Sequence, residues 1–536
     1  MFQITRILTK SCFFSYVFLI IGFHSILTQS TWAQTSSNPK SKLVVMRERF
    51  VDDLGREVIL NGINVVSKSK DDNYLFQSGP EFYSNLKKWG MNSIRLIVIW
   101  DGIEPQPDHF DEKYLKELDQ KIQWATENEL YVVLDLHQDL FSSKFSDGAP
   151  TWATLDKGLP HLTGDVWSDS YLISPAVHQA FDSFWNNEKA SDGKGLQDHV
   201  AEIWQLLAKR YQNNPFVIGY DLFNEPFPGS LAQEAMPAML QKYAELHYEN
   251  TKEVLTEEQL LHIWSDPTSR SEALRSLDSE EDFAPVIDAL YPIVSGFEQE
   301  KLQPFYQKMA NAIRETGDDK IIFLEHTYFS NMGVKSAIER TSFPNGKPDP
   351  QVAYAPHAYD LVVDTEFSQE SSNARLDFIY NRISEKGKEL QMPVWLGEWG
   401  AYYQSGEQIV PVALEAVSLL EKYHFSNAYW SYDPEMENLP YFRKAIIRPY
   451  PVAVSGKLEN YSFDEANQVF EITWSQNTDS AGESLIYFPD LSKVNLRKLS
   501  VPGVELKEFE GSQAGYLVIP FQKGLTQVNI MIHLNP

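Results

Sequence analysis

The sequence has almost no cysteine and too little positive charge to balance its negative charge. Its only cysteine is Cys12, so a hydrophobic core rather than disulfide bonds must hold the fold together. The 46 lysine and arginine residues are outnumbered by 74 aspartate and glutamate residues, and the formal net charge of -28 argues against nucleic acid as a partner. Of the 536 residues, 43% are hydrophobic and only 22% are charged, which is typical of a folded globular protein.

Long hydrophobic runs are missing everywhere except at the N-terminus. Residues 1–33 combine two basic residues, an apolar run and small residues near their end, which predicts a secretory signal peptide cleaved after Ala33. An uncleaved membrane anchor is the alternative, although the run is short for one and polar residues interrupt it. We therefore expect a secreted or periplasmic protein, with a leader and the first β elements at 34–57.

Short apolar, β-branched runs alternate with longer segments of helical periodicity between residues 58 and 449. This alternation is typical of parallel strands joined by crossover helices, and eight strands close a (β/α)8 TIM barrel. The predicted strands are 59–64, 93–99, 131–137, 217–224, 320–326, 352–357, 393–398 and 426–431, and helices are predicted at 80–89, 114–129 and 196–211. The fold class is therefore α/β, with a catalytic barrel at 58–449.

Two segments depart from the barrel pattern. Residues 450–536 contain short alternating runs separated by turn residues, which predicts a C-terminal all-β sandwich domain that packs on the barrel. Its strands are expected at 461–474, 484–488, 496–501, 515–519 and 526–532. Residues 231–302 are too long for an ordinary connection, so we expect a mostly helical excursion that is either a lid or a surface ornament.

Polar residues end the predicted barrel strands, and in this fold the carboxyl ends of the strands surround the active site. Glu225 ends the fourth strand and Glu398 the seventh. Two carboxylates across one cleft are what glycosidic bond cleavage requires, because one must donate a proton while the other attacks in ionised form. Asn224, next to Glu225, can hydrogen-bond a sugar 2-hydroxyl.

Further residues at the strand ends fit the same chemistry. Arg95 and Tyr359 are expected to position Glu398 and keep it ionised, because a nearby cation lowers the pKa of a carboxylate. A buried structural ion pair is the alternative role for Arg95. Trp430 offers a flat apolar face on which a sugar ring can stack. Glu325 adds a third carboxylate, which we interpret as the partner of a cation or of a sugar hydroxyl.

The two histidines of the strand ends need not bind metal. His137 and His357 could be metal ligands or hydrogen-bonded core residues, but no third ligand lies at close spacing. We therefore expect neither a metal nor a cofactor.

The sequence contains five polar motifs: Asp-Leu-His-Gln-Asp at 135–139, Asp-Gly-Ala-Pro at 147–150, Asn-Glu-Pro at 224–226, Gly-Glu-Trp-Gly at 397–400 and Tyr-Trp-Ser-Tyr-Asp at 429–433. Taken together, these motifs resemble glycoside hydrolase family 5, and within it the endoglycoceramidases. The resemblance covers roughly residues 58 to 456, although the excursion at 231–302 is longer than the corresponding segment of that group.

The resemblance implies a retaining mechanism in which Glu225 is the acid/base and Glu398 the nucleophile. It also implies that sugar contacts or positioning of the two carboxylates come from His137, Asp139, Asn224, Tyr359 and Trp430. A lysine after the first strand binds the sugar in that group. Lys68 and Lys70 are both candidates here and we favour Lys70, with Trp167 on the glycan side.

The implied activity is hydrolysis of the bond between the glycan and ceramide of glycosphingolipids, presented in membranes or micelles, by a monomeric enzyme. A polysaccharide endo-hydrolase of the same family, acting on β-glucan or β-mannan, is the alternative, and a non-catalytic glycolipid-binding protein is a third. Ceramide needs an apolar slot, whereas a polymer needs an aromatic trench. Such a slot could be lined by Tyr171, Leu172, Ile173, Ala176, Val177 and Phe181, although ordinary helix packing explains them equally well.

Overall fold

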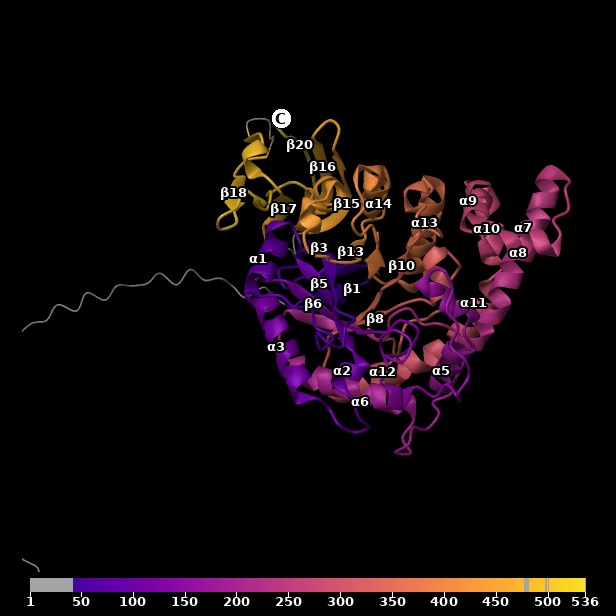
Figure 1. The fold of residues 1–536 in the computed structure, drawn as a ribbon. Helices are drawn as coiled ribbons and strands as arrows, with labels where there is room; N and C mark the ends of the chain where they lie inside the picture. The colour runs from indigo at the N-terminus through magenta and orange to yellow at the C-terminus, as the bar shows by residue number, and fades with distance from the viewer. Residues whose placement is uncertain (1–41, 477–481, 497–498, 500, 536) are drawn as a thin grey trace, which may run out of the picture. The chain divides into compact units, whose positions relative to one another are not determined.

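The computed structural model describes residues 42–476, 482–496, 499 and 501–535, so the predicted signal peptide at 1–33 lies outside them. An eight-stranded parallel sheet with the order β11-β13-β4-β5-β6-β7-β8-β9 forms the barrel (Figure 1). A parallel bridge between Tyr354 and Val394 joins its two ends. The strands are β4 (Asn61–Val65), β5 (Ser93–Ile99), β6 (Tyr131–His137), β7 (Val217–Asp221), β8 (Ile321–Leu324), β9 (Val352–Tyr354), β11 (Trp395–Leu396) and β13 (Ser426–Tyr429). Each overlaps its predicted run, so the barrel is confirmed.

Helices connect the barrel strands and cover the sheet. They are α1 (Pro80–Lys88), α3 (Glu112–Glu127), α5 (Pro175–Trp185), α6 (Leu196–Tyr211), α12 (Gln303–Glu315), α13 (Asn373–Leu390) and α14 (Val410–Tyr423), with short α2 (Trp100–Ile103) and α4 (Ser170–Ile173) near the barrel mouth. Asp111 caps α3 by accepting the backbone N–H groups of Lys113 and Tyr114. In α6 the periodic residues, such as Val200 and Trp204, are fully buried, because this face packs on the sheet.

The excursion after the fourth barrel strand is mostly helical, as predicted. It consists of α7 (Ala235–Thr251), α8 (Glu257–Ser265), α9 (Pro267–Arg275), α10 (Glu280–Asp288) and α11 (Tyr291–Phe297), followed by a π-helical turn at Glu298–Leu302. Figure 1 shows α7 to α10 gathered on one side, next to α11 and α13. Two arginines of α13 hold the excursion in place, since Arg375 donates to the Leu274 carbonyl at 2.8 Å and Arg382 pairs with Asp288 at 3.0 Å.

Two antiparallel sheets form the C-terminal sandwich. The larger has the order β1-β2-β3-β14-β17-β19-β18 and the smaller β15-β16-β20. The strands are β1 (Val44–Met46), β2 (Arg49–Val51), β3 (Glu57–Val58), β14 (Tyr450–Val454), β15 (Gly456–Asp464), β16 (Val469–Gln476), β17 (Ser484–Phe488), β18 (Glu505–Glu508), β19 (Gly515–Ile519) and β20 (Gln527–His533). The run predicted at 461–474 is two strands joined by a turn, and the run at 496–501 lies partly outside the described residues. The first three strands of the chain therefore belong to the same sheet as the C-terminal strands β14, β17, β18 and β19.

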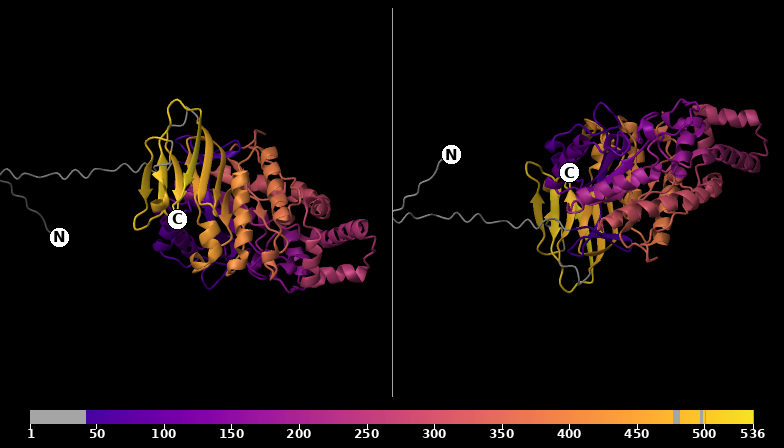
Figure 2. Two further views of the ribbon diagram at one scale, coloured as in Figure 1. Left: turned by 90° about the horizontal axis from the view of Figure 1, so that it is seen from above. Right: turned by 90° about the horizontal axis from the view of Figure 1, so that it is seen from below.

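The sandwich contacts the barrel through specific hydrogen bonds. Tyr487 donates to the Lys88 carbonyl at 2.7 Å and Tyr450 to the Gly90 carbonyl at 2.8 Å. On α14, Glu421 accepts the backbone N–H of Phe463 at 3.0 Å. Figure 2 shows the C-terminal strands, in yellow, against the barrel in both views. Among the helices of the described residues, none has the length and apolar character needed to cross a bilayer.

Candidate active site

The predicted site residues meet at the carboxyl ends of the barrel strands. A short parallel ladder between β10 (His357–Ala358) and β12 (Glu398–Trp399) sits at the mouth and pairs His357 with Glu398. The cavity has a volume of about 230 Å³. Eight of the predicted residues line it, namely His137, Asp139, Trp167, Asn224, Glu225, Tyr359, Glu398 and Trp430. Arg95 and His357 are fully buried beneath them.

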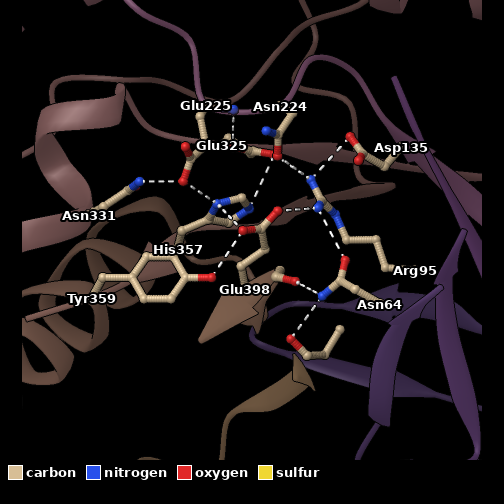
Figure 3. A network of polar contacts seen from close by, with 12 residues as sticks. Asn64, Arg95, Asp135, Asn224, Glu225, Glu325, Asn331, His357, Tyr359 and Glu398 are labelled. Atoms are coloured by element: carbon tan, nitrogen blue, oxygen red, sulfur yellow. Dashed lines mark hydrogen bonds and ion pairs between the residues drawn. The ribbon is translucent and has the colours of Figure 1, made fainter. Parts of the chain in front are cut away.

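Arg95 is the centre of a buried charge network (Figure 3). Its guanidinium donates to Glu398 Oε1 at 2.7 Å and to Glu325 Oε1 at 2.8 Å. It also pairs with Asp135 at 3.0 Å and with Asp221 at 2.9 Å. Asp135 and Asp221 are neighbours across β6 and β7, so both project at one level of the barrel interior. Arg95 thus has both of the roles considered for it. It forms buried ion pairs, and one of its partners, Glu398, is a candidate catalytic carboxylate.

Glu398 lies between donors. Its Oε1 accepts from Arg95 and its Oε2 accepts from the Tyr359 hydroxyl at 3.0 Å (Figure 3). Burial raises the pKa of Glu398 to about 7, against the opposing charges of His357 and Arg95, and the Glu225 carboxylate adds to the rise. The expectation that Arg95 would leave this carboxyl with a lowered pKa is therefore wrong. The cation acts in the predicted direction, but desolvation is the larger effect.

Glu225 has an unusual backbone conformation. Its φ of 44° lies in the left-handed region that residues other than glycine seldom adopt. The backbone N–H of Glu225 donates to Glu325 Oε2 at 2.7 Å, which holds this conformation in place. The Glu225 Oε1 accepts from Asn331 at 2.7 Å and contacts His357 Nδ1 at 2.9 Å.

His357 links the two candidate catalytic carboxylates. Its Nδ1 lies 2.9 Å from Glu225 Oε1 and 3.5 Å from Glu398 Oε2, while its Nε2 lies 3.4 Å from Glu325 Oε1. Although burial lowers it, the surrounding carboxylates raise the pKa of His357 well above its ordinary value. One oxygen each of Glu225 and Glu398 lies within 4.8 Å of the other and of a His357 nitrogen. The site therefore holds two carboxylates at close range with a cation between them.

A second group of charged side chains, Lys68, His137 and Asp139, also lines the cavity. Lys68 pairs with Asp139, and its ammonium lies 4.7 Å from the centre of the Trp430 ring. The ring of His137 stacks on Trp430 at 5.3 Å, and its Nδ1 contacts Asp135 at 2.8 Å. Although burial and Lys68 lower it, Asp135 and Asp139 raise the pKa of His137 to about 9. Burial opposes the shift, but Lys68 and His137 lower the pKa of Asp139 to about 2.

The lysine that lines the cavity is Lys68, whereas the sequence interpretation favoured Lys70. Lys70 pairs with Asp101 at 2.7 Å and its side chain is 73% exposed, compared with 32% for Lys68. The chain turns after Ser69, whose carbonyl accepts the backbone N–H of Asp72, so the two lysines have different surroundings. Trp167 lines the cavity as expected, with its indole N–H donating to Asp364 at 3.2 Å.

The structure also tests the expected roles of Glu325 and of the apolar residues in the third crossover. Glu325 is a partner of Arg95 and of the Glu225 backbone, so the interpretation as a cation partner is confirmed. Of the two explanations for the apolar residues of the third crossover, helix packing holds for Tyr171, Ala176, Val177 and Phe181, which are fully buried. Leu172 and Ile173 are half-buried.

The sequence interpretation missed Asn331, Asn64 and Asp135. Asn331 donates to Glu225 from a short helical turn after β8, and no strand-end pattern marks it. Asn64 accepts from Arg95 at 3.2 Å near the end of β4. Asp135 belongs to the motif at 135–139 but was given no role of its own. Its position two residues before His137 places both side chains on the same face of a strand.

Acidic and histidine side chains at the mouth also form groups that could ligate a metal ion. Asp135, Asp221 and Glu325 form one such group, but the Arg95 guanidinium already pairs with all three. Glu225, His357 and Glu398 form another. We assign this second group to acid/base and nucleophilic chemistry, because its two carboxylates face the open cavity.

A (β/α)8 barrel with two glutamates facing each other at the carboxyl ends of its strands defines a glycosidase. The family model described as cellulase (glycosyl hydrolase family 5) matches residues 51–436, and the glycoside hydrolase family 5 C-terminal domain matches residues 448–532. The chain belongs to glycoside hydrolase family 5 and is an O-glycosyl hydrolase.

Individual relatives carry a narrower description. The chain is 30% identical over 251 residues to an endoglycoceramidase of Cyanea nozakii, covering 41% of this chain and 48%, about half, of that protein. It is 24% identical over 529 residues to an endoglycoceramidase of Hydra vulgaris, covering 88% of this chain and 84% of that protein. The solved endo-glycoceramidase II from Rhodococcus sp. in complex with ganglioside GM3 shares the fold, with a TM-score of 0.69 and 22% identity over 92% of this chain and 100% of that one.

Proposed function

We propose that this chain is a secreted, retaining endo-β-glycosidase that releases the glycan of glycosphingolipids from ceramide. The observation that carries the mechanism is the separation of the two carboxylates, since one oxygen of Glu225 lies within 4.8 Å of one of Glu398. Retaining glycosidases keep their carboxyl groups about 5–5.5 Å apart, whereas inverting enzymes leave about 6.5–9.5 Å for a water molecule. Nearest oxygens within 4.8 Å of each other fit the shorter spacing better than the longer one.

In the first step, Glu398 attacks the anomeric carbon of the sugar at the cleaved bond. Glu225 donates its proton to the glycosidic oxygen, so that ceramide leaves as an alcohol and the glycan becomes an ester of Glu398. Arg95 and Tyr359 hold the attacking carboxylate in place through both of its oxygens. This arrangement leaves Glu398 little freedom to rotate away from the anomeric carbon.

In the second step, water replaces ceramide. Glu225, now ionised, takes a proton from that water, and the resulting hydroxide attacks the anomeric carbon and displaces Glu398. Asn331 and His357 hold Glu225 through one oxygen, Oε1. Two positive charges, on Arg95 and His357, stand beside the carboxylates while negative charge moves between them.

One feature supports a glycolipid substrate over a polysaccharide: the names of the relatives from Cyanea nozakii and Hydra vulgaris both specify endoglycoceramidase. Lys68, Trp167 and Trp430 line one part of the cavity with a cation and aromatic faces that suit a sugar. We propose that the glycan lies there and that the aglycone leaves toward the excursion.

The test is a panel of glycosylceramides with different head groups, with products identified by mass. Release of the intact glycan together with free ceramide is expected. Stepwise loss of single sugars, or cleavage of soluble β-glucan or β-mannan in preference to every glycolipid, would contradict the proposal. Glu398→Gln should abolish turnover, and circular dichroism should show an unchanged fold.

Export is part of the proposal and has its own test. The segment that predicts it, residues 1–33, can be followed by mass spectrometry of the protein isolated from an expressing culture. A mature N-terminus at Gln34 is expected in the exported fraction. An intact N-terminal Met1 in a membrane fraction would favour the anchor instead.

A further inference from the structure

Glu298 is a fully buried carboxylate outside the catalytic cavity. It begins the π-helical turn Glu298–Leu302, through which the excursion joins α12. Turns of this kind are rare and are frequently found at functional sites. Because burial of a carboxylate costs stability unless the group is well hydrogen-bonded, the partners of Glu298 show what it holds in place.

The donors to Glu298 among the described residues come from one segment, residues 327–337, which follows β8. The backbone N–H of Thr327 donates to Oε1 at 3.0 Å, and the backbone N–H of Ala337 donates to Oε2. The Ser336 hydroxyl lies 3.1 Å from each of the two oxygens. One carboxylate therefore joins the two ends of this segment, which we call the clamp segment.

Between its two ends, the clamp segment holds Glu225 in two ways. Thr327 donates through its hydroxyl to the Pro226 carbonyl at 2.8 Å, and the backbone N–H of Tyr328 donates to the same oxygen at 3.0 Å. Asn331 donates to Glu225 Oε1 at 2.7 Å (Figure 3). The segment thus fixes both the backbone that follows Glu225 and the carboxylate itself.

The geometry around Glu298 suits an ionised carboxylate. The two backbone N–H groups donate to different oxygens, and a carboxylate accepts from both, whereas a carboxamide offers only one acceptor oxygen. Burial raises the pKa of Glu298 to about 7, although the donors of the clamp segment oppose the shift. The group is therefore mostly ionised above neutral pH.

We propose that Glu298 is a positioning residue for the acid/base. By joining the ends of the clamp segment, it keeps Asn331 hydrogen-bonded to Glu225, so that Glu225 faces the leaving oxygen of the substrate. The inference rests on the proposed function, because it takes the acid/base role of Glu225 from it, but it holds for any aglycone. The turn that ends the excursion then contributes to catalysis without touching the substrate.

The experiment compares kcat/KM for two lactosides that share one glycan, at about pH 8, where Glu298 is ionised. An alkyl lactoside releases an alcohol, which needs the proton of Glu225, whereas an aryl lactoside with an acidic leaving group does not need it. Glu298→Gln keeps the size of the side chain and removes one acceptor oxygen. It should lower kcat/KM about tenfold to a hundredfold on the alkyl lactoside and less than about threefold on the aryl lactoside.

Glu421→Gln is the matched control, because Glu421 is also buried and also accepts a backbone N–H, from Phe463 at 3.0 Å, but lies on α14 against the sandwich. It should lower the free energy of unfolding and leave the ratio of kcat/KM on the two lactosides unchanged. If circular dichroism shows that Glu298→Gln is misfolded, Ser336→Ala decides, since it removes one donor to the same carboxylate. Its selective loss on the alkyl lactoside should be about twofold to tenfold.

Coupling to Asn331 separates positioning from a general loss of structure. Because Glu298 acts through the clamp segment, the double variant of Glu298→Gln and Asn331→Ala should lose much less activity on the alkyl lactoside than the product of the two single losses. A merely structural role would give the full product.

The two ways of failing are distinguishable. No loss, equal losses on both lactosides, or a double variant whose loss equals the product of the single losses overturns the role of Glu298 and leaves the activity on glycolipids in place. A wild-type enzyme that cleaves a soluble polymer but neither lactosides nor lactosylceramide overturns the proposed function itself. The same variants are then compared on alkyl and aryl glycosides of the sugar in that polymer, since the acid/base role does not depend on the glycan.

Discussion

The hydroxyl of Tyr359 gives the sharpest test of how the nucleophile is held. It donates to Glu398 Oε2 at 3.0 Å, and Tyr359→Phe removes this donor while keeping the ring. A hydrogen bond to a charged group contributes about 1.5–3 kcal/mol. Because 1.36 kcal/mol corresponds to one pKa unit, the loss should raise the pKa of Glu398 by about one to two units.

The direction of the pH effect follows from the role of Glu398. The carboxyl must be ionised to attack, and burial raises its pKa to about 7, so kcat/KM of the free enzyme should fall as the pH drops below this value. In Tyr359→Phe this acid limb should move to about pH 8–9, which lowers kcat/KM at pH 6 by about tenfold to a hundredfold relative to wild type. At alkaline pH the two enzymes should differ much less.

The assay uses an aryl lactoside with an acidic leaving group, because its departure needs no proton from Glu225 and the acid limb then reports Glu398. Tyr403→Phe is the matched control, since Tyr403 lines the same cavity but donates to Asp364 at 2.7 Å. It should keep the wild-type limb. An acid limb that stays in place in Tyr359→Phe, with a uniform loss at every pH, would refute the electrostatic reasoning and leave the phenol a purely steric role.

Three other outcomes are expected. Asn331→Ala loses the 2.7 Å hydrogen bond to Glu225 and should lower kcat/KM on glycolipids by about tenfold to a hundredfold. The loss should be smaller on an aryl lactoside with an acidic leaving group, and equal losses on both substrates would argue against a role through Glu225. Lys68→Met should raise KM for the glycan while Lys70→Met leaves it unchanged. The opposite result would mean that Lys70, not Lys68, contacts the sugar. Trp474→Ala, in the sandwich core at 1% exposure, should lower the free energy of unfolding by about 3–5 kcal/mol in urea titrations, and a loss below about 1 kcal/mol would show that the site collapses around the missing ring.

The barrel could be predicted because buried parallel strands leave a strong local signal. Runs such as 93–99 and 131–137 are mostly apolar, with only a few polar residues, and β5 and β6 have these same limits. Some strands of the sandwich could not be predicted from the sequence. Strand β18, with four exposed residues, and β14, which follows directly on the barrel, carry no alternating pattern. The pairing of β3 with β14 depends on contacts that no local pattern encodes.

The candidate site could be predicted as far as strand ends determine it. Glu225 and Glu398 follow strands that the sequence marks clearly, so the geometry of the barrel brings them together. Lys68 lies on a loop and Asn331 on a short helical turn, and the paths of both segments depend on turns and tertiary contacts rather than on periodicity. The pKa of Glu398 also escaped prediction, because the sequence shows a nearby cation but not the extent of burial.

The pairing of β3 with β14 has a consequence for how the protein acquires its structure. Val58 is the partner of Ala453, so the sheet joins the first strands of the chain to the segment that follows the whole barrel. During synthesis the edge of β3 that pairs with β14 stays unpaired until the whole barrel and β14 have been made. A fragment that starts at β14 would leave the same edge open and invite aggregation, so the C-terminal strands should not form a stable unit when expressed alone.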